Sequence, residues 1–148
     1  MALRSTALLQ LCLLVLVAIE SISAWSGTVT FYNNPGHDSS GGKYTYDIDQ
    51  SQECVNLSCY NDRASSVKWS DIVKWGAFDG QSRIAFYTGK DCTGTVRDWA
   101  IKQPKGYPLN FSLDGIDNAI SSFMIWQYDK KAVSTTLPCP WDFHCCLG

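Results

Sequence analysis

The sequence predicts an all-β protein, built as a β-sandwich of two four-stranded Greek-key motifs. Three observations lead to this fold class. The chain of 148 residues repeats itself internally. Each half contains short runs of β-branched and aromatic residues that end at turns rich in glycine, asparagine, proline or aspartate. No segment sustains the periodicity of an amphipathic helix. Four strands with a tight first hairpin and a long return connection form a Greek key, and two such units pack as a sandwich.

The internal repeat is visible in three places along the chain. Phe31-Tyr32 recurs as Phe86-Tyr87, and residues 54–58 (CVNLS) have a counterpart in residues 108–112 (PLNFS). A six-residue segment follows in each half, and we call these two segments the hexads. The near-constant spacing, 56 residues for the hexads, indicates an internal duplication. Both hexads consist of two Asn or Asp residues, two variable residues and two serines: NDRASS at 61–66 and DNAISS at 117–122.

Strands are expected wherever β-branched and aromatic residues run up to a turn. In residues 43–48 the alternation places Tyr44, Tyr46 and Ile48 on one face of a strand. A short turn of helix is expected at residues 70–77, between the two copies. The six tryptophans, seven tyrosines and six phenylalanines are expected to form the core and the contacts between strands. The other expected strands are residues 28–32, 67–69, 83–87 and 123–126.

The first 24 residues have the features of a secretory signal peptide. Arg4 precedes an apolar run at residues 7–19, and small residues follow up to Ala24, after which we expect cleavage. This run is too short to span a bilayer and no later segment comes close, so no membrane span is expected. The net charge is −2 and the basic residues are scattered, which argues against a nucleic-acid partner. We therefore expect a secreted, extracellular protein, with two sequons, at Asn56 and Asn110, that could carry N-glycans.

Six of the seven cysteines follow the expected signal peptide, an even number that is typical of disulfides in an oxidising compartment. The spacing leaves their pairing open. Cys54 with Cys59 would close a short local loop, and the adjacent Cys145 and Cys146 are expected to take different partners. The cysteines near His144 are also zinc-ligand types, but a secreted chain favours disulfides. The six are Cys54, Cys59, Cys92, Cys139, Cys145 and Cys146.

The hexads are compact clusters of oxygen donors, which is the chemistry that calcium requires. Ca²⁺ takes about six to eight oxygen ligands in irregular geometry, so one site can combine a carboxylate, backbone carbonyls, a hydroxyl and water. Asn and Asp also tolerate the tight or left-handed backbone that turns carbonyls inward. The alternative is that both hexads are ordinary turns whose polar side chains cap the backbone. Occurrence of the same pattern at matched positions favours calcium.

The second copy resembles the Greek-key signature of the βγ-crystallin superfamily. Its pattern is an aromatic residue, Tyr87, a spaced glycine, Gly94, and later the serine pair 121–122. In that superfamily the glycine lets the first hairpin fold over the sheet and the serine holds the hairpin by hydrogen bonds. The first copy departs from the pattern, because residues 33–40 lengthen its hairpin. The resemblance covers about residues 25–128, with motif 1 at about 27–70 and motif 2 at about 82–128; residues 129–148 form a cysteine-containing C-terminal tail.

The resemblance implies two calcium sites, each shared between the copies and completed by a backbone carbonyl from a first-hairpin loop. Asn34 and Lys90 are the candidates for those carbonyls. Each hexad holds one carboxylate, so affinities from micromolar to millimolar are expected. The positive charge of Arg63 should weaken the first site if its side chain cannot turn outward, and the last serine of each hexad should brace its loop. The candidate ligands of the first hexad are the side chain of Asn61 or Asp62, the carbonyl of Arg63 and the hydroxyl of Ser65; those of the second are the side chain of Asp117 or Asn118, the carbonyl of Ala119 and the hydroxyl of Ser121.

The predicted function is that of a secreted protein stabilised by two bound calcium ions. No enzyme is expected, because the two histidines, His37 and His144, lie outside any catalytic motif. One alternative is an antimicrobial, toxin-like or inhibitor protein of defence on the same fold. Another is a carbohydrate-binding or cell-surface module, which would need an exposed aromatic patch around Trp75, Trp99 or Trp141. The sequence identifies no extracellular protein or glycan partner.

Overall fold

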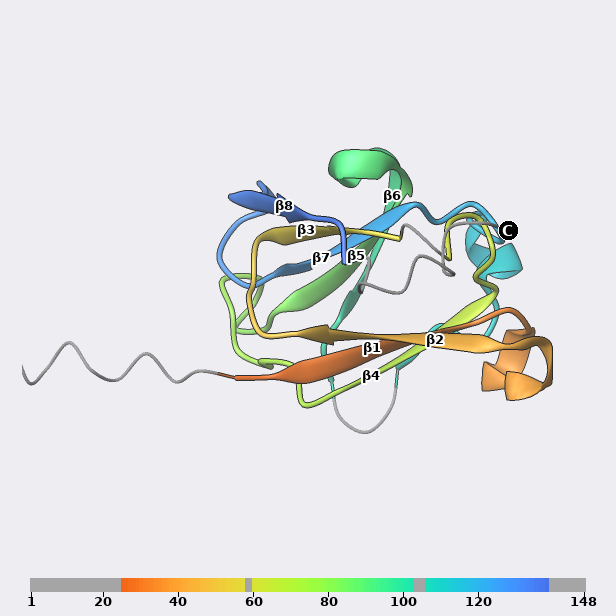
Figure 1. Cartoon of the computed structure of the whole chain (residues 1–148). Helices are drawn as coiled ribbons and strands as arrows, with labels where there is room; N and C mark the ends of the chain where they lie inside the picture. The colour runs from red at the N-terminus through yellow and green to blue at the C-terminus, as the bar shows by residue number, and fades with distance from the viewer. Residues whose placement is uncertain (1–24, 58–59, 103–105, 139–148) are drawn as a thin grey trace, which may run out of the picture.

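The computed structural model describes residues 25–57, 60–102 and 106–138. They form two β-sheets that pack face to face, joined by loops and short 3₁₀ helices (Figure 1). The expected all-β sandwich is confirmed. Within the described residues, no helix is long and apolar enough to cross a membrane. The expected signal peptide, residues 1–24, lies outside the described residues.

The smaller sheet contains three strands of the first copy, in the order β2-β1-β4. Their bounds are Gly27–Tyr32 for β1, Lys43–Ile48 for β2 and Ser66–Ser70 for β4. Both pairings are antiparallel. Because side chains alternate along a strand, β1 buries Val29 and Phe31 in the core while Thr28 and Thr30 lie on the outer face.

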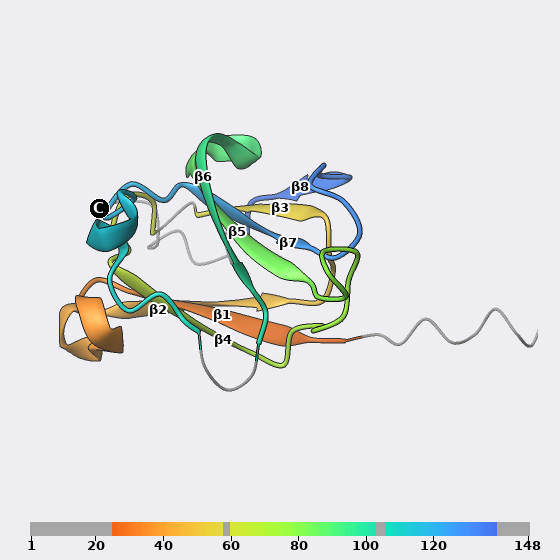
Figure 2. The same ribbon diagram turned by 180° about the vertical axis from the view of Figure 1, so that it is seen from behind.

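The larger sheet has five strands in the order β6-β5-β7-β3-β8 (Figure 2). Three strands come from the second copy: β5 (Arg83–Gly89), β6 (Thr93–Ala100) and β7 (Ser122–Trp126). The fourth, β3 (Glu53–Asn56), belongs to the first copy and pairs antiparallel with β7. The last, β8 (Ser134–Thr136), runs parallel to β3 at the sheet edge.

The two copies interlock because each sends one segment to the other. Strand β3 crosses from the first copy into the sheet of the second. In return, the segment after residue 106 lies along β4: the amide of Val67 donates to the carbonyl of Pro108 at 3.3 Å, and the amide of Phe111 donates to the carbonyl of Ser65 at 2.8 Å. The two halves are therefore parts of one domain with a shared core.

The core lies between the two sheets and is rich in aromatic residues, as expected from the composition. Phe31 contacts Phe86 and Phe123 across the sandwich, with ring centroids 5.7 and 5.5 Å apart. Burying a large apolar side chain stabilises the fold by about 1.5–3 kcal/mol. The largest fully buried side chains are Phe31, Phe86, Phe111, Phe123, Leu57, Ile84, Ile101, Ile116, Ile120, Met124, Ile125 and Val29.

The first hairpins differ in length, as the sequence predicts. In the second copy only the 3₁₀ turn η3 (Lys90–Cys92) separates β5 from β6. In the first copy, η1 (Pro35–His37) and η2 (Ser39–Gly41) lie between β1 and β2. Gly94 has a φ of 80°, and a Cβ there would lie 2.7 Å from Thr88 Oγ1. This position therefore requires glycine for the hairpin to close.

Three local expectations differ from the structure. Residues 71–77 contain no helix, because Ile72 is buried in the core and the segment makes irregular backbone contacts instead. The described part of the second copy also lacks a strand corresponding to β3. Pro108 has no N–H for a ladder, and the chain turns into the 3₁₀ helix η4 (Phe111–Asp114). Finally, β8 lies in the segment assigned to the C-terminal tail, where the amide of Val133 donates to the carbonyl of Gln52 at 2.8 Å.

Candidate metal centre

The two hexads have the same local conformation. Their second residues, Asp62 and Asn118, have φ values of 55° and 48°. This left-handed region is tolerated by Asp and Asn better than by most residues. Their fourth residues, Ala64 and Ile120, are fully buried. Each loop is thus anchored in the core by one apolar side chain, while its first and second residues reach the surface.

The hexads lie against each other and exchange matched backbone hydrogen bonds. The amide of Asp62 donates to the carbonyl of Ile120, and the amide of Asn118 donates to the carbonyl of Ala64, both at 3.0 Å. The fifth residue of each hexad also pairs with the end of a first-hairpin strand. Ser65 N donates to Tyr32 O at 2.8 Å, and the equivalent bond from Ser121 measures 2.9 Å. The arrangement has approximate twofold symmetry.

Three oxygens from different parts of the chain converge at Ser121, and one of them is its own Oγ. Its Oγ lies 3.4 Å from Asp62 Oδ1 and 3.0 Å from the backbone carbonyl of Thr88. A serine hydroxyl carries one proton, so it can donate fully to only one of these two acceptors. A cation among the three oxygens would satisfy all of them. This cluster combines the first hexad, the second hexad and the second copy's hairpin.

The first residue of each hexad carries a buried side-chain oxygen that accepts no hydrogen bond from any described residue. Asn61 Oδ1 and Asp117 Oδ1 are both buried and have no hydrogen-bond partner among the described residues. Their other side-chain atoms contact the second hexad residue: Asn61 Nδ2 donates to Asp62 Oδ2 at 2.8 Å, and Asn118 Nδ2 donates to Asp117 Oδ2 at 3.3 Å. An unpaired buried oxygen is costly, so its occurrence at matched positions fits a ligand for a cation.

The other candidate ligands of the hexads also have free oxygens. Within the described part of the chain, the backbone carbonyls of Arg63 and Ala119 accept no hydrogen bond. Both are the third hexad residue. The Ser65 hydroxyl, which is equivalent to that of Ser121, has no hydrogen bond to any described group either. Asn33 occupies the position equivalent to Thr88, and its Oδ1 is likewise buried and unpaired there.

The two hairpin carbonyls proposed from the sequence have other partners. The carbonyl of Asn34 accepts from Ser66 Oγ at 2.7 Å, and that of Lys90 accepts from Thr93 Oγ1 at 2.8 Å. The carbonyl that the structure places beside Ser121 is that of Thr88, which the sequence reasoning missed. Its signal was available, because Thr88 directly follows the repeated Phe-Tyr pair and begins the hairpin loop.

The last serine of each hexad fastens the first hairpin of its own copy. Ser122 Oγ donates to the carbonyl of Gly89 at 2.6 Å and accepts from the amide of Cys92 at 3.1 Å. Ser66 Oγ makes the equivalent pair with Asn34 and with the amide of His37, at 2.7 and 3.0 Å. Both serines are fully buried, and each hydroxyl donates one hydrogen bond and accepts another. They brace the loops, as the sequence predicts.

The guanidinium of Arg63 lies over the ring of Tyr60, 5.6 Å from its centroid. Burial raises the pKa of the Tyr60 hydroxyl, and the nearby positive charge of Arg63 acts in the opposite direction. Because the face of an aromatic ring attracts a positive charge, the Tyr60 ring stabilises the Arg63 guanidinium in this position. The expected weakening of the first site by Arg63 depends on how far this contact keeps its charge from the hexad oxygens.

The donor set determines which metals the region suits. Among the described residues, no three His, Cys, Asp or Glu side chains cluster as metal ligands. The oxygens gathered by the hexads come from a carboxylate, amide side chains, hydroxyls and carbonyls. Such a set suits a hard cation such as Ca²⁺ and does not suit Zn²⁺, which prefers nitrogen and sulfur. The residues present fit calcium.

Comparison with solved structures gives βγ-crystallin domains. An archaeal βγ-crystallin is 24% identical, with a TM-score of 0.42, and the match covers 66% of this chain and 95% of that one. A βγ-crystallin from Ciona intestinalis is 18% identical, with a TM-score of 0.44 and coverages of 66% and 96%. A βγ-crystallin domain from Clostridium beijerinckii is 20% identical, with a TM-score of 0.43 and coverages of 67% and 97%. No family model and no curated protein matches the sequence.

Two Greek keys exchange a segment, and a serine holds the first hairpin of each. The fold is a β-sandwich of two interlocked copies. The two-sheet sandwich that the sequence predicts is thus confirmed.

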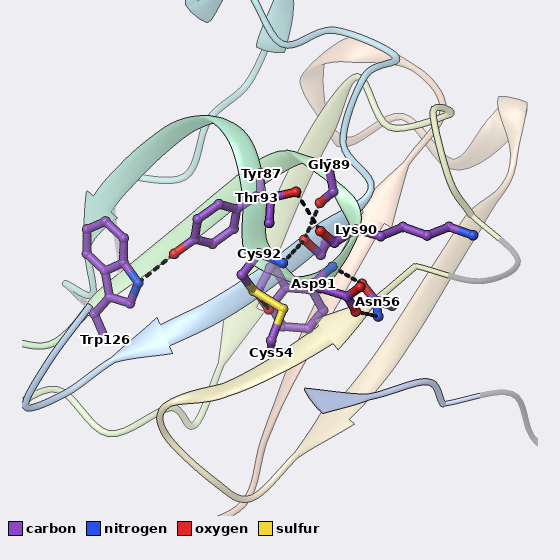
Figure 3. The surroundings of a disulfide bond; sticks show 11 residues. Cys54, Asn56, Tyr87, Gly89, Lys90, Asp91, Cys92, Thr93 and Trp126 are labelled. Carbon is purple, nitrogen blue, oxygen red and sulfur yellow. Dashed lines mark hydrogen bonds between the residues drawn. A yellow bond between two sulfur atoms is a disulfide. The ribbon is translucent and has the colours of Figure 1, made fainter. Parts of the chain in front are cut away.

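A disulfide joins the two copies of the repeat (Figure 3). Cys54 on β3 bonds to Cys92 in η3, with Cα atoms 5.8 Å apart. Of the pairings that the sequence left open, the local one between Cys54 and Cys59 is therefore wrong, because the exchange of β3 brings Cys54 under the second hairpin. Cys59 and the three C-terminal cysteines lie outside the described residues.

The three tryptophans considered for ligand stacking differ in exposure. Trp75 is 61% exposed and contacts Tyr128, itself 58% exposed, with ring centroids 5.6 Å apart. Trp99 is half-buried and packs on Phe86 and Phe111. Trp141 lies outside the described residues. Of the two tryptophans that lie within the described residues, Trp75 is therefore the one that contributes to an exposed aromatic pair.

Proposed function

We propose that this chain is a secreted, non-enzymatic protein that binds two calcium ions, each at a site shared between its two hexads. The observation that carries the proposal is the convergence of Asp62 Oδ1, Ser121 Oγ and the Thr88 carbonyl around a single hydroxyl proton. The unpaired buried oxygens of Asn61 and Asp117 support it independently. The first site contains Asp62, Ser121 and Thr88, and the symmetry assigns Asn118, Ser65 and Asn33 to the second.

Calcium would act by stabilising the folded domain. The unfolded chain scatters these oxygens over more than half of the sequence, so it cannot bind the ion in the same way. A ligand that binds only the folded state raises the free energy of unfolding, by about 2.7 kcal/mol at a concentration about 100 times the dissociation constant. The expected consequence is a calcium-dependent rise in melting temperature and in protease resistance.

Variants of the fifth hexad residues test the proposal. Ser65→Arg and Ser121→Arg each place a bulky cation at one site, so each variant should bind one calcium ion instead of two. Ser112→Ala provides a control, because Ser112 is a serine of the η4 turn outside both hexads. Stoichiometry measured by calorimetry, with circular dichroism to verify the fold, gives the answer. Two ions bound by either arginine variant would contradict the ligand assignment.

The exposed pair Trp75 and Tyr128 favours a carbohydrate-binding module as the second candidate function. Aromatic faces of this kind bind sugar rings by stacking, and the two rings are exposed next to each other. Glycan-array binding that disappears in Trp75→Ala and persists in the control Trp99→Phe would support this function. Absence of any glycan signal would exclude it for the sugars on the array. The calcium proposal does not depend on the result.

A further inference from the structure

The two Asn-x-Ser sequons occupy equivalent positions of the internal repeat but have different surroundings. Asn56 ends β3, and Asn110 is its counterpart in the segment that returns to the first copy. The Asn56 side chain contacts the first hairpin of the opposite copy, whereas beside Asn110 that hairpin contacts the backbone of Leu109. The residue that the hairpin presents there is Asp91 in one case and Gly36 in the other. This difference determines which asparagine remains accessible.

Both the nitrogen and the oxygen of the Asn56 side-chain amide are hydrogen-bonded in the folded protein. Its Nδ2 donates to Asp91 Oδ1, and its Oδ1 accepts from the amide of Asp91, both at 2.8 Å (Figure 3). The residue is only 6% exposed. The disulfide between Cys54 and Cys92 holds the two segments together at neighbouring positions. A sugar on Nδ2 would have to separate β3 from η3.

Asn110 keeps its nitrogen free of the described residues. Its Oδ1 accepts from the amide and the hydroxyl of Ser112, at 3.0 and 2.6 Å, which leaves Nδ2 without a hydrogen bond in the described part of the structure. The opposing hairpin contributes Gly36, which donates from its backbone amide to the Leu109 carbonyl at 2.6 Å. A Cβ on Gly36 would meet nothing within 4 Å, so the space beside this hairpin is open.

The turn around Asn110 is also local, and its neighbours are exposed. The hydrogen bonds from Ser112 to Asn110 involve only the sequon itself, so they can form before the domain folds. Leu109 and Leu113 beside the sequon are 59% and 85% exposed. The surface here therefore has room for a large attached group, and a glycan would lie next to apolar surface that is otherwise in contact with water.

We propose that Asn110 is the N-glycosylated residue of the folded protein and that Asn56 is unmodified. In the transfer, Asn110 Nδ2 forms a bond to the anomeric carbon of an oligosaccharide carried on a lipid diphosphate. The bond from that carbon to the diphosphate oxygen breaks, the lipid diphosphate leaves with the electron pair, and the amide loses one proton to a base of the transferase. This inference rests on secretion, which is part of the proposed function, and is independent of calcium binding.

Chains modified at Asn56 would not reach the native state. Transfer precedes completion of folding, so both sequons meet the transferase in an open chain. A glycan on Asn56 removes one hydrogen of the amide and places a bulky group where Asp91 must lie. Only chains without it can close η3 over β3 and form the Cys54–Cys92 disulfide. The folded state thus selects the modification pattern.

The test is to secrete the full chain from a eukaryotic cell line and to map the glycan by peptide mass spectrometry. Enzymatic deglycosylation in heavy-oxygen water marks each occupied asparagine as a labelled aspartate. We expect the label at Asn110 and none at Asn56. Asn110→Gln should abolish the glycan. Ser58→Ala, which destroys the other sequon without altering Asn56, should leave the mass of the glycoprotein changed only by the substitution.

Two outcomes would overturn the inference. One is a glycan on Asn56 in secreted protein that contains the Cys54–Cys92 disulfide. The other is secreted protein with Asn110 unmodified, which would leave the proposed secretion in place. Retention of the unglycosylated chain inside the cell would overturn both the inference and the secretion. Calcium binding is measured separately on enzymatically deglycosylated protein.

Discussion

Asp62 and Ser121 lie 59 positions apart in the chain, yet Asp62 Oδ1 and Ser121 Oγ are 3.4 Å apart in the folded protein. The contact exists because the two hexads lie against each other, each donating a backbone hydrogen bond to the fourth residue of the other. A site at Ser121 therefore takes its carboxylate from the opposite copy. The predictions that follow from this relationship would differ if all ligands of one ion came from a single hexad.

The first prediction concerns which pairs of residues serve the same calcium ion. Asp62→Gly removes the carboxylate while keeping the left-handed backbone, and Ser121→Ala removes the hydroxyl. Each should lower the affinity of one site by at least about tenfold, or about 1.4 kcal/mol. Because the two residues share a site, the double variant should still bind one ion when titrated calorimetrically.

A matched pair within one hexad provides the comparison. Asp62→Gly combined with Ser65→Ala affects both sites, so this double variant should retain no site with the affinity of the parent. The reverse pattern would show that each hexad supplies its own site: one site of parental affinity in the variant with Asp62→Gly and Ser65→Ala, and none in the variant with Asp62→Gly and Ser121→Ala.

The second prediction separates bracing from ligation. Ser66→Ala and Ser122→Ala each remove a buried hydroxyl that joins a hairpin carbonyl to a hairpin amide. Leaving those groups unpaired should lower the free energy of unfolding by about 1–3 kcal/mol, as measured by denaturant titration. Both variants should still bind two calcium ions. Loss of an ion with unchanged stability would make these serines ligands.

The third prediction concerns the disulfide. Replacing Cys54 and Cys92 together by alanine opens a loop whose ends are 38 residues apart. The entropy of that loop in the unfolded chain corresponds to about 4 kcal/mol, so the calcium-free double variant should be less stable by up to this amount. Thermal unfolding monitors the change. Equal stability of the variant and the parent would mean that hydrogen bonds such as those between Asn56 and Asp91 hold η3 on β3 without the disulfide.

The fourth prediction concerns pH and His37. Burial, followed by the positive charge of Lys68, lowers the pKa of His37 below its ordinary value of 6.5. The folded state therefore binds this proton less readily than the unfolded chain does. The contribution is fully present above pH 6.5 and is lost as the pH falls through the lowered pKa of the folded state.

The measurement compares the parent with His37→Asn, since asparagine tolerates the φ of 61° at this position. Without calcium, the free energy of unfolding of the parent should fall more steeply than that of the variant as the pH is lowered through this range. Parallel curves for the two proteins would contradict the assignment.

The local features of this fold could be predicted from the sequence. The strands that contain Phe31 and Phe86 follow from short apolar runs, and the role of Gly94 in the first hairpin is implied by the Greek-key signature that the second copy resembles. The bracing by Ser122 follows from its place in the repeated hexad. Each of these depends on neighbouring residues or on the repeat itself.

Features that depend on contacts distant in sequence could not be predicted in the same way. The pairing of Cys54 with Cys92 requires β3 to leave its own copy, and no residue near Cys54 indicates that exchange. The placement of the Thr88 carbonyl beside Ser121 also depends on how the hairpin folds over the sheet. Pro108 explains why the described part of the second copy has no strand corresponding to β3, although that copy repeats the same pattern.

The most direct test of the calcium proposal is a calorimetric titration of the folded, calcium-free protein with Ca²⁺, together with its melting temperature at each calcium concentration. Shared sites at the two hexads predict heat that saturates at two ions per chain and a melting temperature that rises with calcium. No heat and no shift in melting temperature at millimolar calcium would contradict the proposal.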